Sequence, residues 1–219
     1  PEVVDRALAM AARLEPPWFL WVHFYDPHRP YEPPPELAAR ALGGRDLAAL
    51  DEPARWRALY AGEVAQVDAE IGRPRGRDPL VCVVADHGEG LGEHGEEDHG
   101  QLLYDTTVRV PLIFSHPALD PRVVADPVSV ADVAPTLLAL VGVGPPLPAS
   151  AGGADLSGLL AGGPAPPRSV YFEACNAFYS YGWSPLFGLL LDGEKVIEGP
   201  RSEVFDPRSD PDELADLSA

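Results

Sequence analysis

The chain is poor in basic residues and in long apolar runs, and both scarcities bear on its partners. Its 219 residues include 16 Lys and Arg against 34 Asp and Glu, which gives a formal net charge of -18. Phosphate backbones and anionic membranes demand a basic surface, so the composition argues against nucleic acid and such membranes as partners. No apolar run reaches the roughly 18 residues that would span a bilayer, so we expect no membrane insertion.

Cysteine is equally scarce, with only Cys82 and Cys175 present. Two cysteines are too few for a disulfide framework, and they lack the Cys-x-x-Cys spacing of zinc sites. Cys82 lies in an apolar run, which predicts a buried thiol on a strand. The N-terminus has neither an initiator methionine nor a basic flank before an apolar core. We therefore expect that the natural start is missing or was removed, and the compartment stays unknown.

Apolar periodicity and the placement of Pro and Gly predict an α/β fold. Helices are expected at 3–14, 53–71 and 129–141, and buried strands at 18–24, 80–85 and 110–114. Prolines between 27 and 35 place a loop directly after the first strand, because proline neither continues a helix nor donates to a sheet.

The composition divides the chain into three parts. Residues 1–145 are predicted to form the α/β domain, 146–168 a Gly/Pro-rich connection, and 169–219 a small C-terminal subdomain. Strands expected at 169–174 and 186–192, followed by an Asp192-Gly193 turn, predict an antiparallel appendage.

Five of the six histidines lie in two short windows, each directly after a predicted strand. These are His23 and His28 in the first window, and His87, His94 and His99 in the second. Ligands of α/β sheets bind outside the carboxyl ends of the strands, so both windows are placed for chemistry.

Asp86 and His87 follow the second strand at once and offer one oxygen and one nitrogen donor from a rigid support. An acidic protein can bind an anionic group only where a local positive charge outweighs the negative electrostatic potential of the protein, and a bound divalent cation supplies such a charge directly. Two alternatives stay open. One is a solvated acidic loop with incidental histidines, and the other is a zinc site made by His87 and His94, although their seven-residue gap differs from the spacing in zinc proteases.

The order of motifs resembles the type I sulfatases of the alkaline-phosphatase superfamily. The stretch 86–113 is similar to the sulfatase segment in which an Asp and a following Asn or His bind the metal. The stretch 18–31 resembles the one in which the family keeps an active-site histidine before a proline. Further matches at 60–72, 132–138 and 203–211 extend the resemblance, in order, over nearly the whole chain.

The resemblance implies a sheet flanked by helices and the hydrolysis of sulfuric esters, with this chain as the C-terminal portion. It makes Asp86 and His87 metal ligands, most often to Ca²⁺, with Mn²⁺ or Mg²⁺ as alternatives. It places His28 near the leaving oxygen as a hydrogen-bond donor or general acid, and His99 against the sulfate. The partner implied is a sulfate-ester substrate.

Three features depart from the family pattern. The family nucleophile is a formylglycine made from Cys or Ser within Cys/Ser-x-Pro/Ala-x-Arg, and neither cysteine begins such a motif here. The paired aspartates that complete the metal shell in the family are also absent. We expect both in a missing N-terminal part, so this chain alone should be inactive. The segment 73–79 is also shorter than in relatives.

Two other functions remain open from the sequence. The first is a phosphodiesterase, a phosphonate monoester hydrolase or a phosphoryl transferase on the same scaffold, which would share Asp86 and His87. The second is a non-catalytic half-domain that binds a partner or an ion.

Overall fold

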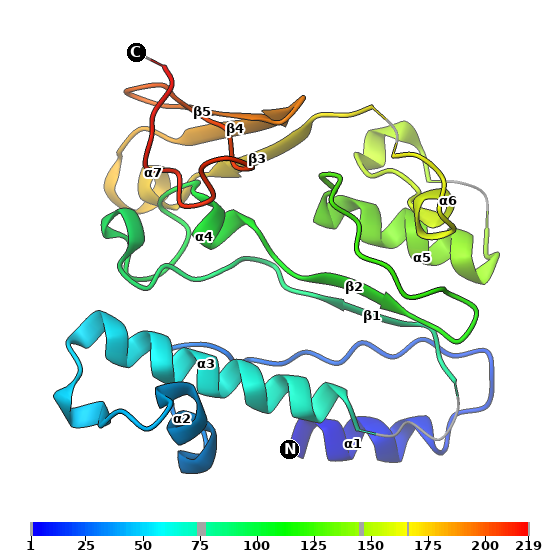
Figure 1. Cartoon of the computed structure of the whole chain (residues 1–219). Coiled ribbons are helices and arrows are strands. Elements are labelled where there is room, and N and C mark those ends of the chain that lie inside the picture. The colour runs from blue at the N-terminus through cyan, green and yellow to red at the C-terminus, as the bar shows by residue number, and fades with distance from the viewer. Residues whose placement is uncertain (1, 74–77, 145–146, 166, 219) are drawn as a thin grey trace. The chain divides into compact units, whose positions relative to one another are not determined.

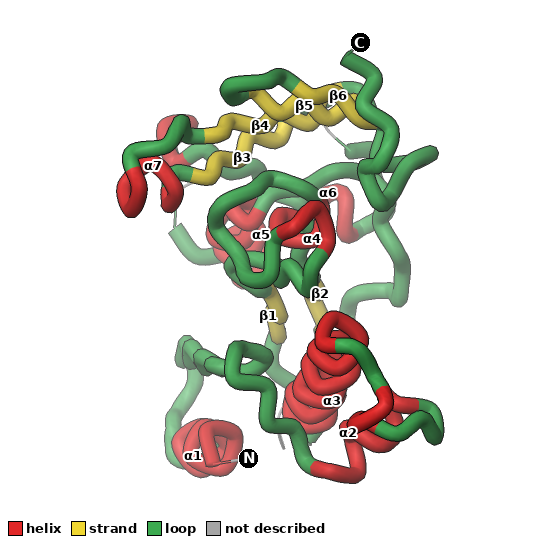
Figure 2. The backbone as a smooth tube through the Cα atoms, turned by 90° about the vertical axis from the view of Figure 1, so that its left-hand side faces the viewer, coloured by secondary structure: helices red, strands yellow, loops and turns green. Residues whose placement is uncertain are grey.

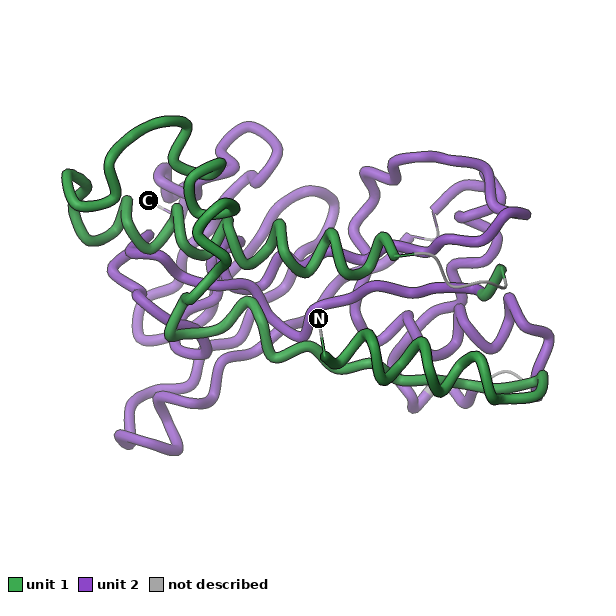
Figure 3. The backbone as a smooth tube through the Cα atoms, turned by 90° about the horizontal axis from the view of Figure 1, so that it is seen from below, with its two compact units in different colours: residues 1–79 green, residues 80–219 purple. Residues whose placement is uncertain are grey.

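The computed structural model describes residues 2–73, 78–144, 147–165 and 167–218. The chain divides into two compact units, residues 1–79 and 80–219 (Figure 1, Figure 3). No helix in the described part of the chain is long and apolar enough to cross a membrane. The predicted division into 1–145, 146–168 and 169–219 stays a prediction, and the central residues 74–77 of the shortened segment lie outside the described residues.

The first unit is helical. Its elements are α1 (Glu2–Ala11), α2 (Pro35–Leu42), a 3-10 turn η1 (Leu47–Ala49) and α3 (Glu52–Ile71). The Asp51 side chain caps α3 by accepting a hydrogen bond from the Ala54 amide at 2.9 Å. Helix α2 packs against α3 (Figure 1). Gly62 permits a close approach here, because a Cβ at this position would lie 2.8 Å from the Pro33 ring. The predicted helices at 3–14 and 53–71 are confirmed.

The strand predicted at 18–24 is wrong. This segment contains neither helix nor strand, and Phe19 and Trp21 are 76% and 74% exposed. An apolar run shows that residues suit a sheet, but a strand also needs a neighbour to accept and donate its backbone hydrogen bonds. No strand in the described residues pairs with this segment. The proline-rich loop also ends earlier than expected, since Pro35 opens α2, where its missing amide hydrogen costs nothing.

The second unit holds two antiparallel sheets (Figure 2). Strand β1 (Val81–Val84) pairs with β2 (Leu112–Ser115), with Cys82 opposite Phe114. Burial raises the pKa of the half-buried Cys82 thiol, as expected for a strand cysteine. The second sheet runs in the order β3 (Val170–Ala174), β4 (Leu186–Leu191), β5 (Glu194–Glu198) and β6 (Glu203–Phe205).

Turn chemistry explains the hairpin between β4 and β5. Asp192 and Gly193 both have positive φ, at 53° and 91°, which is the backbone that a tight two-residue hairpin requires. The antiparallel appendage and the strands predicted from residue 80 onward are therefore confirmed. Strand β6 is one that the sequence did not predict.

Short helices connect these strands. They are η2 (Glu93–Gly95), α4 (Asp105–Val108), η3 (Val130–Asp132), α5 (Val133–Val141), η4 (Ala149–Ala151), α6 (Ser157–Leu160) and α7 (Asn176–Tyr181). Ser129 and Asp132 form a capping box at the start of the predicted 129–141 helix. The buried Asp132 carboxylate also accepts hydrogen bonds from Arg168 at 2.5 Å and from the Ala154 amide at 2.8 Å. These bonds tie α5 to the Gly/Pro-rich connection.

The core of the second unit lies between the four-stranded sheet and the segment around α4. Its buried members are Leu103, Ala174, Ile197 and Phe205. Lys195 is buried beside them, with its Nζ 2.8 Å from Asp105 Oδ1 and 2.7 Å from Glu213 Oε1. The loop that carries three predicted site residues is therefore fixed at one end by β1 and at the other by this core.

Candidate active site

Asp86 and His87 begin the loop that follows β1. The His87 amide donates to Asp86 Oδ1 at 3.1 Å, and His87 Nε2 lies 3.8 Å from the same oxygen. His87 Nδ1 lies 2.8 Å from the carbonyl oxygen of Gly88. A carbonyl can only accept, so in the neutral ring Nδ1 carries the proton and Nε2 keeps its lone pair.

This pair fits a divalent cation. Two atoms that each lie about 2.4 Å from one ion are at most about 4.8 Å apart, and Asp86 Oδ1 and His87 Nε2 meet that limit. The Asp86 carboxylate and the unprotonated His87 nitrogen are also donors of the right kind. The backbone carbonyl on Nδ1 fixes the tautomer, as is usual for metal-binding histidines.

The loop is held in place by a close backbone approach at Gly88. The Gly88 amide donates to the Thr107 carbonyl at 2.7 Å, and the Glu89 amide donates to the Thr106 carbonyl at 3.0 Å. A Cβ on Gly88 would lie 2.2 Å from the Thr106 oxygen, so only glycine fits here. The position of His87 therefore depends on α4, to which Thr106 and Thr107 belong.

The structure brings His99 to the same place. The His87 and His99 rings are stacked, with centroids 3.7 Å apart and an interplanar angle of 23°. His99 Nδ1 lies 3.0 Å from Glu89 Oε1 and 2.9 Å from Asp98 Oδ1. Both carboxylates accept, so Nδ1 carries a proton and the ring is oriented by it. Asp86, His87 and His99 thus lie in one cluster.

Glu89 is a member of the cluster that sequence reasoning missed. Its side chain is only 5% exposed and is directed at a histidine ten positions later in the chain. The sequence signal that could have indicated Glu89 as a site residue was its position two residues after His87. Glu89, Asp98 and His99 form a second group whose ligand atoms all lie within 4.8 Å of one another. This second group also offers donors to a cation, and the Asp86 and His87 pair stays a prediction.

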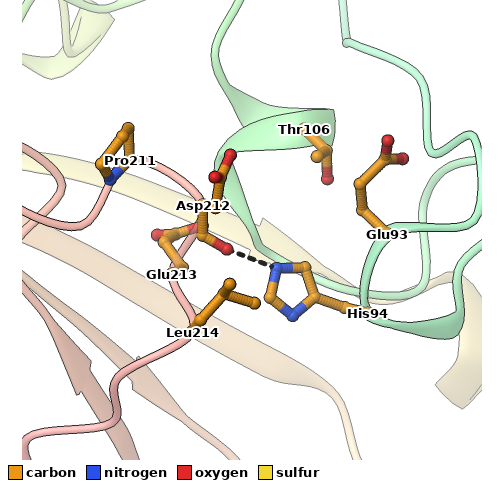
Figure 4. A pocket seen from close by; sticks show the side chains of 7 residues that line it. All are labelled: Glu93, His94, Thr106, Pro211, Asp212, Glu213 and Leu214. Atoms are coloured by element: carbon orange, nitrogen blue, oxygen red, sulfur yellow. Dashed lines mark hydrogen bonds between the residues drawn. The ribbon is translucent and has the colours of Figure 1, made fainter.

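His94 is engaged elsewhere. Its ring stacks on Tyr104 at 3.6 Å, and its Nε2 donates to the Asp212 carbonyl at 3.0 Å (Figure 4). Burial and the bond to Glu203 raise the pKa of Tyr104 to about 12. His94 belongs to no group of three or more ligand atoms in the part of the chain that is described, which argues against the zinc site with His87.

A pocket beside His94 contains none of the four predicted site residues. It is lined by Glu93, His94, Thr106, Pro211, Asp212, Glu213 and Leu214 (Figure 4).

His28 belongs to the first unit, in the loop that precedes α2. Its amide donates to Glu63 Oε2 at 3.2 Å, and the Glu32 amide donates to Glu63 Oε1 at 2.6 Å. Its Nδ1 lies 2.7 Å from the Arg29 carbonyl oxygen, so Nδ1 carries the proton in the neutral ring. Glu63 is 3% exposed, and burial raises the pKa of its carboxyl. Helix α3 therefore positions His28, whose placement against the ester stays a prediction.

A family model for sulfatases matches residues 2–143, and the chain belongs to the sulfatase family. The uncharacterized sulfatase YidJ of Escherichia coli K12 is 28% identical, over 96% of this chain and 48% of that relative. This chain thus spans about half the length of that relative.

Solved structures share the fold. A Bacteroides fragilis protein named as a sulfatase, yidJ, superposes with a TM-score of 0.77 at 20% identity, covering 99% of this chain and 53% of the other. The phosphonate monoester hydrolase of Agrobacterium radiobacter gives a TM-score of 0.75 at 21% identity, with 98% and 55% covered. At these identities the likeness shows the fold alone. The predicted sulfatase-like α/β fold of the alkaline-phosphatase superfamily is confirmed.

Proposed function

We propose that the protein to which this chain belongs hydrolyses sulfate monoesters with the help of a divalent cation. One observation carries the proposal. In the loop after β1, Asp86 Oδ1 and His87 Nε2 lie 3.8 Å apart, with the His99 ring stacked on His87. A chain of charge -18 needs such a local positive centre to accept an anionic ester.

Each residue has a distinct role in this proposal. Asp86 and His87 hold the cation, most often Ca²⁺ in the family, and a bound cation polarises the sulfate oxygens and orients the nucleophile. His99 is aligned through Nδ1–H by Glu89 and Asp98 and, as an imidazolium, donates a hydrogen bond from Nε2 to the sulfate. His28, as an imidazolium whose Nδ1–H is held by the Arg29 carbonyl, donates from Nε2 to the leaving oxygen, where negative charge develops.

The nucleophile is proposed to be a formylglycine in a part of the parent protein that this chain does not include. This chain alone is therefore proposed to be inactive. The exposed Phe19 and Trp21 support that reading, because large exposed apolar side chains mark surfaces that another segment covers.

The test uses the full-length parent protein, freed of metal by chelation. Sulfate release from para-nitrophenyl sulfate is measured before and after addition of Ca²⁺, Mn²⁺ or Mg²⁺. We expect activity to return with at least one of these ions. The same preparation is assayed on a phenylphosphonate monoester and on a phosphodiester. Faster turnover of either phosphorus ester, with no sulfate release, would replace this proposal with the phosphoryl alternative.

A further inference from the structure

The one-turn helix α4 supports the candidate site at its C-terminal end. The Thr107 carbonyl accepts a hydrogen bond from the Gly88 amide at 2.7 Å. The Thr106 carbonyl accepts one from the Glu89 amide at 3.0 Å. The last carbonyls of a helix have no partner within it, and Pro111, four residues after Thr107, has no amide hydrogen to offer. The loop that carries the site therefore binds carbonyls that the helix itself leaves free.

A helix of four residues needs support from outside itself, because the first helical turn costs more conformational entropy than its few hydrogen bonds return. The residue before α4, Tyr104, provides no side-chain cap. The cap comes instead from Glu213, which lies 108 positions after Asp105 in the chain. Glu213 Oε2 accepts a hydrogen bond from the Asp105 amide at 2.6 Å, and the charge on the carboxylate strengthens this bond. The beginning of α4 is thus held by the C-terminal end of the chain.

Glu213 is itself held in place by several constraints. Its side chain and that of Lys195 are both 1% exposed, and Lys195 Nζ lies 2.7 Å from Glu213 Oε1. The same Nζ lies 2.8 Å from Asp105 Oδ1, so the three side chains form a closed group. The backbone of Glu213 has a φ of 51°, which is uncommon for a residue other than glycine. Such a conformation persists only where the surroundings fix it, and residues of this kind gather at functional sites.

The residue before Glu213 binds the site loop directly. The Asp212 carbonyl lies 3.0 Å from His94 Nε2, and the His94 ring stacks on Tyr104, which precedes α4 (Figure 4). Two neighbouring residues near the C-terminus therefore contact both the loop and the helix that supports it.

We infer that Glu213 is a positioning residue of the candidate active site. Glu213 fixes α4, and α4 fixes the amides of Gly88 and Glu89. The first of these amides follows His87, and the Glu89 carboxylate orients His99 at 3.0 Å. A shift of α4 would therefore displace both histidines together. The inference rests on the function proposed above, because it concerns the geometry of that site.

The test is hydrogen exchange of the peptide spanning residues 86–92 in the full-length protein. Glu213→Gln keeps the side-chain volume but has one accepting oxygen, so either the Asp105 amide or Lys195 loses its partner. Asp132→Asn is the matched control, because it is the same change at another buried carboxylate that holds a helix start. The Asp132 carboxylate accepts hydrogen bonds from Ser129, Ala154 and Arg168.

Exchange of the 86–92 peptide should accelerate about tenfold or more in Glu213→Gln, the effect of losing a hydrogen bond to a charged group. It should stay at the wild-type rate in Asp132→Asn. The peptide spanning 133–141, which covers α5, should show the reverse and accelerate only in Asp132→Asn. The two peptides together separate a role in positioning the loop from a general loss of stability.

Glu213→Asp is a second variant that keeps a negative charge beside Lys195 but draws the carboxylate back from the Asp105 amide by one methylene. It should also accelerate exchange of the 86–92 peptide, and it applies the same test if Glu213→Gln fails to fold. Wild-type exchange of this peptide in the folded Glu213 variants would overturn the inference. Equal acceleration of the 86–92 and 133–141 peptides would overturn it as well.

A kinetic measurement separates this inference from the proposed function. Displacement of the site by a fraction of an ångström should lower kcat/KM for para-nitrophenyl sulfate about tenfold or more in the Glu213 variants. Asp132→Asn should keep the wild-type kcat/KM. If the wild-type protein releases no sulfate, but exchange of the 86–92 peptide accelerates in the Glu213 variants, Glu213 positions the loop and the sulfatase proposal fails. If sulfate is released and neither exchange nor kcat/KM changes in these variants, the sulfatase proposal stands and the role of Glu213 is refuted.

Discussion

Replacing Glu63 with Gln should loosen the loop that carries His28. The Glu63 carboxylate is buried and accepts hydrogen bonds from the His28 amide at 3.2 Å and the Glu32 amide at 2.6 Å. A glutamine fills the same volume but has only one accepting oxygen, so one of the two amides loses its partner. A hydrogen bond to a charged group contributes about 1.5–3 kcal/mol, so the local opening equilibrium should rise about 10- to 150-fold.

Hydrogen exchange of the peptide spanning residues 27–33 in the full-length protein measures this effect. Asp68→Asn is the matched control, since Asp68 is an exposed carboxylate on the same helix. Exchange should accelerate in Glu63→Gln and stay at the wild-type rate in Asp68→Asn. Equal exchange rates in all three proteins would refute the reasoning that Glu63 holds this loop.

The same variant should change the pH dependence of stability. Burial raises the folded-state pKa of Glu63 above its unfolded value, so the folded protein binds this proton more tightly. The stability from this group is complete below the unfolded pKa and is lost as pH rises through the folded pKa. Urea midpoints measured across that window should therefore fall in the wild-type protein and fall less in Glu63→Gln.

Two further predictions concern catalysis and folding. His28→Asn in the full-length enzyme should slow esters with poor leaving groups more than activated aryl esters, and equal losses in kcat/KM on both would remove its role as an acid. Lys195→Met breaks a buried ion-pair cluster and leaves Glu213 and Asp105 without their cation. The free energy of unfolding should drop by about 3–5 kcal/mol in urea titrations. A loss below about 1 kcal/mol would show that the ion-pair cluster contributes little to stability.

Local patterns predicted much of the fold. The periodicity of residues 53–71, the apolar run 80–85 and the Asp192-Gly193 turn each depend on neighbours in sequence, and each prediction was confirmed. The segment 18–24 failed because a strand depends on a partner that an apolar run does not reveal. Helix α7 was missed because its aromatic residues are weak helix formers, and the Gly182 cap stabilises it through backbone bonds.

In the candidate site too, the features that depend on sequence neighbours were predicted, and those that depend on distant residues were not. Asp86 and His87 were predicted because they are adjacent and follow a buried strand. The stacking of His99 on His87 and the contact of Glu89 with His99 arise from the bend of the loop, which brings together residues ten or more positions apart. No short-range pattern encodes that bend. In the sequence only Gly88 indicates the bend, because the loop passes the Thr106 carbonyl at a point where no side chain fits.

The most direct test of the account is a metal measurement on the full-length protein and two variants. Asp86→Ala removes a proposed ligand, and Asp98→Ala removes a carboxylate from the second group of donors, Glu89, Asp98 and His99. Bound Ca²⁺, Mn²⁺ and Mg²⁺ are quantified after dialysis, together with calorimetric titration of the ion that binds. The account predicts that Asp86→Ala loses the ion and that Asp98→Ala retains it. Retention in Asp86→Ala with loss in Asp98→Ala would place the cation at the second group and contradict the assignment of Asp86 and His87.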